Sequence, residues 1–125
     1  MRCFRFSLFI LLLALFAGGV SAKASSAELI MFESENCEWC EVWLEKIGPI
    51  YPKTPEGKYA PLRRVDIADE MPKDLAKLRP ASFTPTFVVM ENGVEITRIL
   101  GYPGEDFFWG LLEEALKKIG YRPES

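Results

Sequence analysis

Residues 35–43 read ENCEWCEVW and contain two cysteines, Cys37 and Cys40, that are separated by two residues. Such a pair can be half of a zinc site, a structural disulfide, or a dithiol that exchanges electrons with other proteins. The only other cysteine is Cys3, and the sequence contains no histidine. A tetrahedral zinc site would therefore need carboxylates for half of its ligands, which is an uncommon way to hold zinc. We expect no metal site.

A structural disulfide is the stronger alternative to exchange. A disulfide stabilises a fold mainly by constraining the unfolded chain, and this effect grows with the length of the loop that the bond closes. The loop between Cys37 and Cys40 is very short, so the bond would constrain little. The spacing therefore favours a bond that is made and broken during function.

The N-terminal residues 1–22 read MRCFRFSLFILLLALFAGGVSA. They begin with Arg2 and Arg5, continue with an almost unbroken apolar run and end in small residues, which is the order of a secretory signal peptide cleaved after Ala22. An uncleaved membrane anchor is the alternative, although the apolar run is short for a helix that spans a bilayer. We expect an exported protein whose mature part, residues 23–125, is one small domain.

The chain is acidic. The 125 residues include 15 Lys and Arg against 18 Asp and Glu, a net charge of −3, and without Arg2 and Arg5 the charge falls to −5. An acidic exported domain with no basic run is poorly suited to binding nucleic acid. Nucleic-acid partners are therefore not expected.

Hydrophobic patterning predicts the strands. Short apolar runs at residues 28–32 and 62–67 are typical of buried strands. Residues 86–91 and 94–100 flank Asn92-Gly93, a pair that suits the type I′ turn of a β-hairpin. The first two strands should be parallel and the last two antiparallel, which predicts an α/β fold with a mixed sheet.

We predict a first helix that begins near Cys37, a short helix over 72–78 and a last helix over 105–119, whereas the proline-rich segment 51–61 predicts a loop. In the first helix we expect a core-facing row of Trp39, Trp43, Ile47 and Ile50. In the last helix we expect core positions at Phe108, Leu111, Leu112, Ala115, Leu116 and Ile119.

A CxxC pair at the start of the first helix, Thr84-Pro85 ahead of a hairpin, and a terminal helix together resemble the thioredoxin superfamily. The resemblance covers nearly all of the chain from Glu28 onward. It implies a thioredoxin-like fold, a mixed four-stranded sheet flanked by helices, with the usual leading strand and helix trimmed at the N-terminus. Residues 40–67 also resemble the periplasmic thioredoxins of the bacterial sulfur-oxidation (Sox) system.

The resemblance implies a thiol–disulfide reductase that needs no cofactor. Cys37 is the expected nucleophile, because backbone N–H groups and the helix dipole lower the pKa of a thiol at the start of a helix. Cys40, one turn further on and facing inward, is the expected resolving thiol. In the family Pro85 is cis and lies against the dithiol, and the backbone of Thr84 pairs with the substrate.

The motif departs from the family pattern at several positions. Glu38 stands where a small neutral residue is usual, and we expect it to disfavour negative charge on Cys37. Trp39 either contacts the disulfide and the partner protein or packs into the core. Met31 stands where thioredoxins often bury an aspartate, so water or a nearby glutamate would have to accept the proton of Cys40.

The implied partners are an exported protein disulfide, in particular that of the Sox sulfur-carrier protein, and a membrane thiol transporter as the electron donor. The protein is expected to act in the periplasm as a monomer. A reductase for cytochrome c maturation or for general disulfide handling is an alternative, as is a non-catalytic binding module stapled by its CxxC. If the acidic residues near the dithiol select a partner, its surface there should be neutral or basic; these residues are Glu33, Glu35, Glu38, Glu41 and Glu45.

Overall fold

The central strand of the sheet is β1 (Ala27–Glu33), which is mostly buried in the computed structural model of residues 26–124. A strand covered on both faces is apolar along its whole length, which is why its sequence lacks alternation. β1 pairs in parallel with β2 (Leu62–Asp66) and antiparallel with β3 (Thr86–Glu91), and β3 pairs antiparallel with β4 (Val94–Leu100). The sheet order is β2-β1-β3-β4, which confirms the predicted mixed sheet and thioredoxin-like class.

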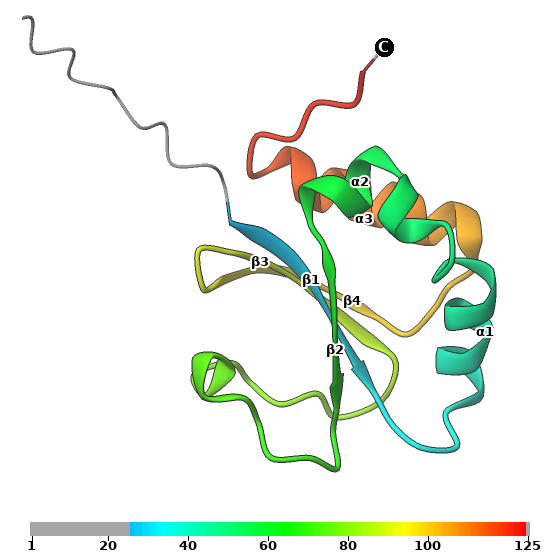
Figure 1. Cartoon of the computed structure of the whole chain (residues 1–125), viewed down its shortest axis with the longest axis vertical. Coiled ribbons are helices and arrows are strands. Elements are labelled where there is room, and N and C mark those ends of the chain that lie inside the picture. Colours follow the sequence, from blue (N-terminus) through cyan, green and yellow to red (C-terminus); the bar gives the residue numbers. More distant parts are fainter. Residues whose placement is uncertain (1–25, 125) are drawn as a thin grey trace, which may run out of the picture.

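Three helices lie together on one face of the sheet (Figure 1): α1 (Glu38–Lys46), α2 (Pro55–Tyr59) and α3 (Glu105–Lys117). They share one apolar core with β1, β3 and β4, whose largest buried members are Leu29, Met31, Trp43, Ile47, Tyr51, Phe87, Phe108, Leu112 and Leu116. Within residues 26–124, β1 is the first helix or strand.

The other face of the sheet is covered by the chain between β2 and β3. This segment contains one turn of 3₁₀ helix, η2 (Lys73–Leu75), shorter than the helix predicted over 72–78. It packs on a second, smaller core of Ile30, Phe32, Val65, Leu75, Val88 and Met90. The hairpin turn agrees with the prediction, since Asn92 and Gly93 both have positive φ, 50° and 78°, as a type I′ turn requires.

The loop predicted over 51–61 was wrong, because this segment forms a 3₁₀ turn, η1 (Tyr51–Lys53), followed by α2. The Thr54 hydroxyl caps α2 by accepting a hydrogen bond from the Gly57 amide at 3.0 Å, and Pro55 fills the first helical position, where proline is favoured. Tyr51 is fully buried and its hydroxyl donates to the Ala60 carbonyl at 2.6 Å. Pro52 and Pro55 therefore lie at the starts of helical turns.

Three apolar side chains predicted for the core are exposed: Trp39 (58%), Ile50 (42%) and Leu111 (47%). Trp39 lies in the first turn of α1, and Ile50 follows the end of this helix. Leu111 lies beside the stripe of α3 that faces the sheet. Of the four side chains that helical periodicity assigned to the core in and after α1, only Trp43 and Ile47 are buried.

The predicted signal peptide, residues 1–22, lies outside the described residues, as do residues 23–25 and 125. Within residues 26–124 no helix has the length and apolar character needed to cross a membrane.

Gly57 should not tolerate a side chain. A Cβ atom at this position would lie 1.8 Å from the Tyr51 carbonyl oxygen, a backbone atom that cannot move alone. We expect Gly57→Ala to lower the free energy of unfolding by at least about 2 kcal/mol, measured by urea denaturation. The matched control is Gly110→Ala in α3, where nothing lies within 4 Å of the added Cβ, and this change should stabilise by about 0.5–1 kcal/mol. Equal effects of the two substitutions would contradict the close approach at Gly57.

Candidate redox site

Cys37 and Cys40 form a disulfide at the start of α1, with an S–S distance of 2.05 Å. Cys37 is the N-cap of the helix, and its Sγ accepts a hydrogen bond from the Cys40 amide at 3.2 Å. Cys37 is half-buried, whereas Cys40 is only 3% exposed. The two cysteines therefore differ, because Cys37 is more accessible than Cys40 to a group from another protein.

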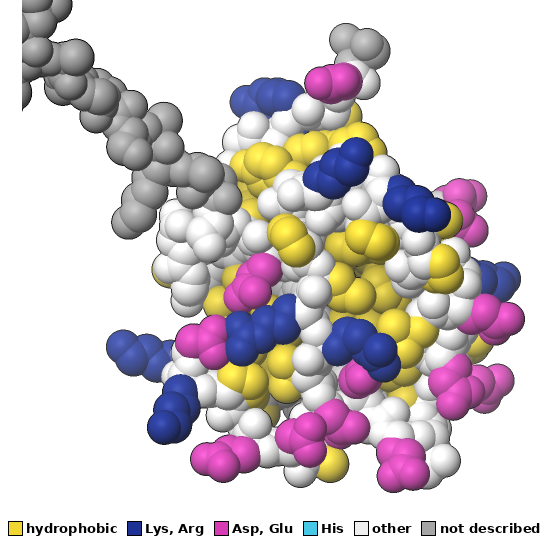
Figure 2. Space-filling model, viewed as in Figure 1, with side chains coloured by type: hydrophobic (Ala, Val, Ile, Leu, Met, Phe, Trp, Pro, Cys, Tyr) yellow, Lys and Arg dark blue, Asp and Glu magenta, His cyan; other side chains and the backbone are white. Residues whose placement is uncertain are grey.

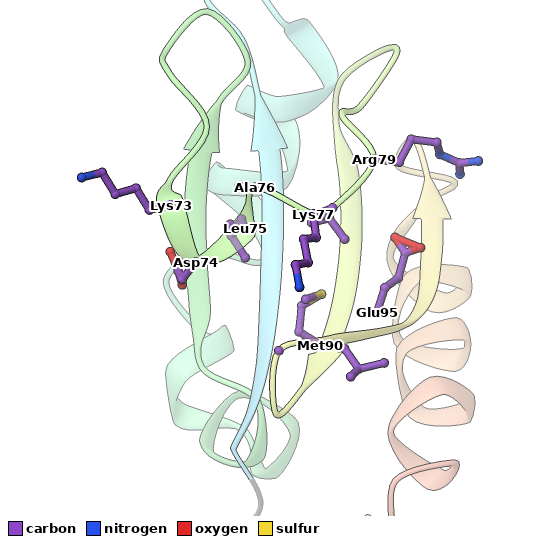
Figure 3. A pocket seen from close by; sticks show the side chains of 11 residues that line it. Lys73, Asp74, Leu75, Ala76, Lys77, Arg79, Met90 and Glu95 are labelled. Atoms are coloured by element: carbon purple, nitrogen blue, oxygen red, sulfur yellow. The ribbon is translucent and has the colours of Figure 1, made fainter.

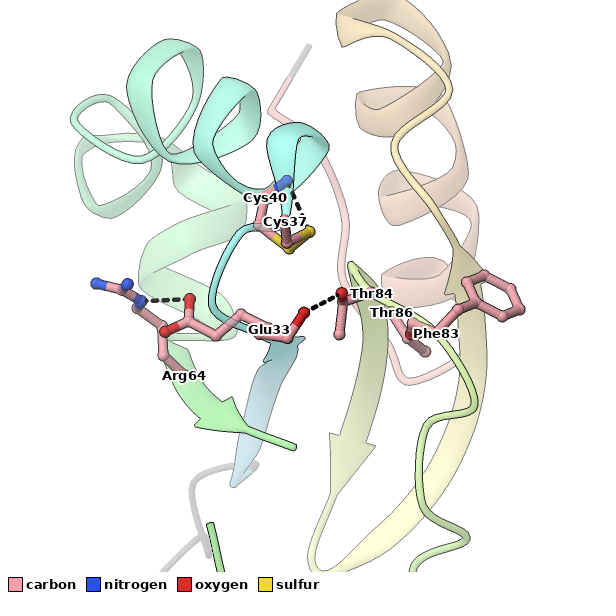
Figure 4. The surroundings of a disulfide bond; sticks show 8 residues. Glu33, Cys37, Cys40, Arg64, Phe83, Thr84 and Thr86 are labelled. Atoms are coloured by element: carbon pink, nitrogen blue, oxygen red, sulfur yellow. Dashed lines mark hydrogen bonds and ion pairs between the residues drawn. A yellow bond between two sulfur atoms is a disulfide. The ribbon is translucent and has the colours of Figure 1, made fainter. Parts of the chain in front are cut away.

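The loop before β3 lies opposite the disulfide (Figure 4). The peptide bond between Thr84 and Pro85 is cis, as the family resemblance implied. The pairing of β1 with β3 places the end of β1 beside this loop, and the hydroxyls of Ser34 and Thr84 are hydrogen-bonded at 2.6 Å. The Pro85 carbonyl accepts from the Gly101 amide at 2.8 Å. Thr84 and Pro85 thus lie at the same end of the sheet as the CxxC pair, at the point where β1 ends and β3 begins.

Trp39, between the two cysteines, is not part of the core. Of the two interpretations considered for this residue, the structure excludes core packing and leaves a large apolar side chain exposed beside the disulfide. Phe83 is also exposed, but it points away from the sulfurs (Figure 4). Glu38 is exposed in the same helical turn as Trp39.

Acidic side chains surround this end of the molecule. Glu35, Glu38 and Glu41 are all exposed near the disulfide. On the face shown in Figure 2, acidic groups gather along the lower edge, where Figure 1 places the loops that follow β1 and β2. Below the disulfide, Met31 is fully buried in the same core cluster as Cys40. No ionisable group occupies the Met31 position, as the sequence indicated.

A polar pocket of about 520 Å³ reaches Cys40 from the side. Its lining includes Glu33 at the end of β1 and Arg64 on β2, whose Nε donates to the Glu33 carboxylate at 2.8 Å (Figure 4). Sequence reasoning noted Glu33 only as part of the acidic surroundings and missed Arg64. No local signal could have linked these residues, because only the register of β1 with β2 brings them together.

A second cavity, of about 710 Å³, lies between η2 and the β3–β4 hairpin (Figure 3). Met90 and Leu75 contribute apolar surface, and the charged residues around it include Lys77, Arg79 and Glu95. Its lining contains neither cysteine nor the Thr84-Pro85 loop, so it is separate from the redox site. Across residues 26–124, no group of three or more Cys, His, Asp or Glu side chains is placed to hold a metal ion.

The chain is similar to known thioredoxins. A scan against family models and a search of curated protein sequences gave no match. Among solved structures, the periplasmic thioredoxin SoxS from Paracoccus pantotrophus, in its reduced form, is 45% identical, with a TM-score of 0.70 over 75% of this chain and 99% of that one. Two further thioredoxins share the fold. The one from Malassezia sympodialis is 24% identical, with a TM-score of 0.54 over 72% of this chain and 75% of that one. The one from Thermus thermophilus is 21% identical, with a TM-score of 0.58 over 76% of this chain and 77% of that one.

A chain lacking residues 1–22 should contain one reducible disulfide and no bound metal. We expect no free thiol before treatment and two thiols after a mild reductant, because Cys37 and Cys40 form the only described disulfide and Cys37 is accessible. Thiol counting and elemental analysis of the purified protein check this. One tightly bound zinc per chain would contradict a function by thiol–disulfide exchange.

Proposed function

Because this chain belongs to the thioredoxin superfamily and is a thiol–disulfide oxidoreductase, we propose that it is an exported reductase in which Cys37 attacks and Cys40 resolves. The observation that carries these roles is the unequal exposure of the two cysteine residues. The half-buried Cys37 caps α1, where backbone N–H groups stabilise a thiolate. Cys40 is covered and positioned to attack only its neighbour.

In the proposed reaction the Cys37 thiolate attacks one sulfur of a partner disulfide. The partner's sulfur–sulfur bond breaks, and its other sulfur leaves as a thiolate and takes up a proton. Cys40 then loses its proton and attacks Cys37 Sγ, which releases the second partner sulfur and forms the Cys37–Cys40 disulfide. Two electrons have passed to the partner, and a reductant must restore the dithiol.

We assign partner binding to the surface beside Cys37. Trp39 offers exposed apolar area, and the backbone at Thr84, next to Pro85, lies across from the disulfide. Glu38 is the proposed modulating residue, because its negative charge in the same turn disfavours the Cys37 thiolate.

The likeness to a periplasmic thioredoxin of the Sox system supports the remaining assignments. We propose that residues 1–22 direct export to the periplasm, that a membrane thiol transporter supplies electrons, and that the monomeric protein keeps the Sox sulfur-carrier protein reduced. The acidic site surface favours a partner that is neutral or basic around its disulfide.

Trapping of the covalent intermediate identifies the partner. With Cys40→Ser, the nucleophile remains but resolution is lost, so a mixed disulfide should accumulate in cells grown on thiosulfate. The matched variant Cys37→Ser should trap nothing, because Cys40 is buried. Non-reducing purification followed by mass spectrometry should recover the sulfur-carrier protein. Apocytochrome c instead would indicate a role in cytochrome maturation, equal trapping by both variants would refute the assigned roles, and no partner under any growth condition would favour a binding module.

The redox potential should be that of a reductant. Glu38 favours the disulfide over the Cys37 thiolate. We therefore expect a redox potential of about −270 mV, and not one at the oxidant end of the family, about −120 mV. Equilibration with glutathione measures it. Glu38→Gln should shift the potential to a less negative value, and the control Glu45→Gln, further along α1, should not. A wild-type value less negative than about −180 mV would indicate an oxidase or isomerase.

A further inference from the structure

The resolving step needs a proton acceptor that the core does not provide. Cys40 is 3% exposed, and Met31 and Trp43 belong to the apolar cluster around it. Burial in apolar surroundings disfavours a thiolate, yet Cys40 must give up its proton as it attacks Cys37. The proton has to leave through the polar pocket that reaches Cys40 from the side.

The charged groups that line this pocket come from each element around it: Glu33 on β1, Glu35 in the following loop, Glu41 on α1, and Arg64 and Asp66 on β2. Glu35 and Glu41 are exposed to solvent. The Asp66 carboxylate accepts from the Ala68 amide at 2.8 Å, within the turn after β2. These three carboxylates are therefore directed to solvent or used locally.

Glu33 differs from the other three in burial and in position. Its side chain is only 17% exposed and is held by Arg64 at 2.8 Å. Side chains two residues apart on a strand share a face, so Glu33 lies on the face of β1 that carries Met31 and supports α1. In Figure 4 the Glu33 side chain extends toward the Arg64 guanidinium, and both Glu33 and Cys40 line the pocket.

We propose that Glu33, oriented by Arg64, accepts the proton of Cys40 during resolution of the mixed disulfide. The Cys40 Sγ–H bond breaks, the proton passes to the Glu33 carboxylate, and the sulfur electron pair forms the bond to Cys37 Sγ. The bond between Cys37 and the partner sulfur breaks, and the partner leaves as a thiolate that takes up the proton from Glu33 or from water. Arg64 is a positioning residue that keeps the carboxylate at the pocket.

Proton transfer and bond formation are expected to be coupled. A free carboxylic acid is a stronger acid than a thiol by about four pKa units, so the transfer is favourable only while the new sulfur–sulfur bond forms. This is general base catalysis, which typically accelerates a step by about 10²–10⁴-fold. The proposal rests on the roles assigned to Cys37 and Cys40 in the proposed function.

Stopped-flow reaction of the reduced protein with 5,5′-dithiobis(2-nitrobenzoate) separates the two steps. Attack by Cys37 releases the first coloured thiolate, and resolution by Cys40 releases the second. Glu33→Gln should leave the first phase unchanged and slow the second by at least about tenfold at pH 6. The difference should narrow as the pH rises, because hydroxide then removes the proton. Partial recovery is expected for Glu33→Asp.

Glu41→Gln is the control, because it removes the same charge from the same pocket and should not slow the second phase. An unchanged or faster second phase in Glu33→Gln would overturn the proposal. If that variant does not fold, Arg64→Gln replaces it, and there too an unchanged second phase would overturn the proposal. A separate measurement tests the roles assigned to the two cysteines. If Cys37→Ser still released the first coloured thiolate at the wild-type rate, Cys37 would not be the attacking thiol.

Discussion

The antiparallel pairing of β1 with β3 is the interaction on which the redox site depends. It sets Phe32 opposite Thr86, so the loop that follows β1 and carries the chain to Cys37 lies beside the loop that precedes β3. The Ser34–Thr84 hydrogen bond joins the two loops. A slip of one residue would turn Leu29 and Met31 away from the helices. Burial of these side chains therefore maintains the geometry of a site to which they contribute no chemistry.

The face of β1 that supports α1 changes character along its length. Leu29 and Met31 are fully buried and belong to the core, whereas Glu33, at the end of the strand, lines a polar pocket. Cys40 lies at this boundary, in the apolar cluster and in the pocket lining alike. The fold thus has an uncharged core beneath the dithiol, while the acidic side chain Glu33 lines the pocket that reaches Cys40 and is paired with Arg64. Because the carboxylate lies at the end of the strand, the fold avoids the desolvation cost of a charge buried in the core.

Local patterns predicted the elements that depend on local physics. The apolar runs of β1 and β2, the Asn92-Gly93 turn and the start of α1 at the CxxC motif were all found from the sequence. The errors occurred where neighbouring elements decide the outcome. Prolines between 51 and 61 were taken as breakers, but Thr54 caps a helical turn there and Tyr51 is buried under it. Periodicity assigned Trp39 and Leu111 to the core, but both are exposed, because Trp39 lies in the first turn of α1 and Leu111 lies beside the buried stripe of α3.

The sequence by itself determined the chemistry of the site, because two cysteines three positions apart at a helix start can form a disulfide without help from distant residues. The sequence also contains no histidine, the commonest metal ligand. Only the tertiary structure decided what surrounds that disulfide: the hydrogen bond between Ser34 and Thr84, the exposure of Trp39, and the pairing of Glu33 with Arg64. The hydrogen bond and the ion pair join residues that are far apart along the chain, and strand register, which is set by packing of the whole core, brings these residues together.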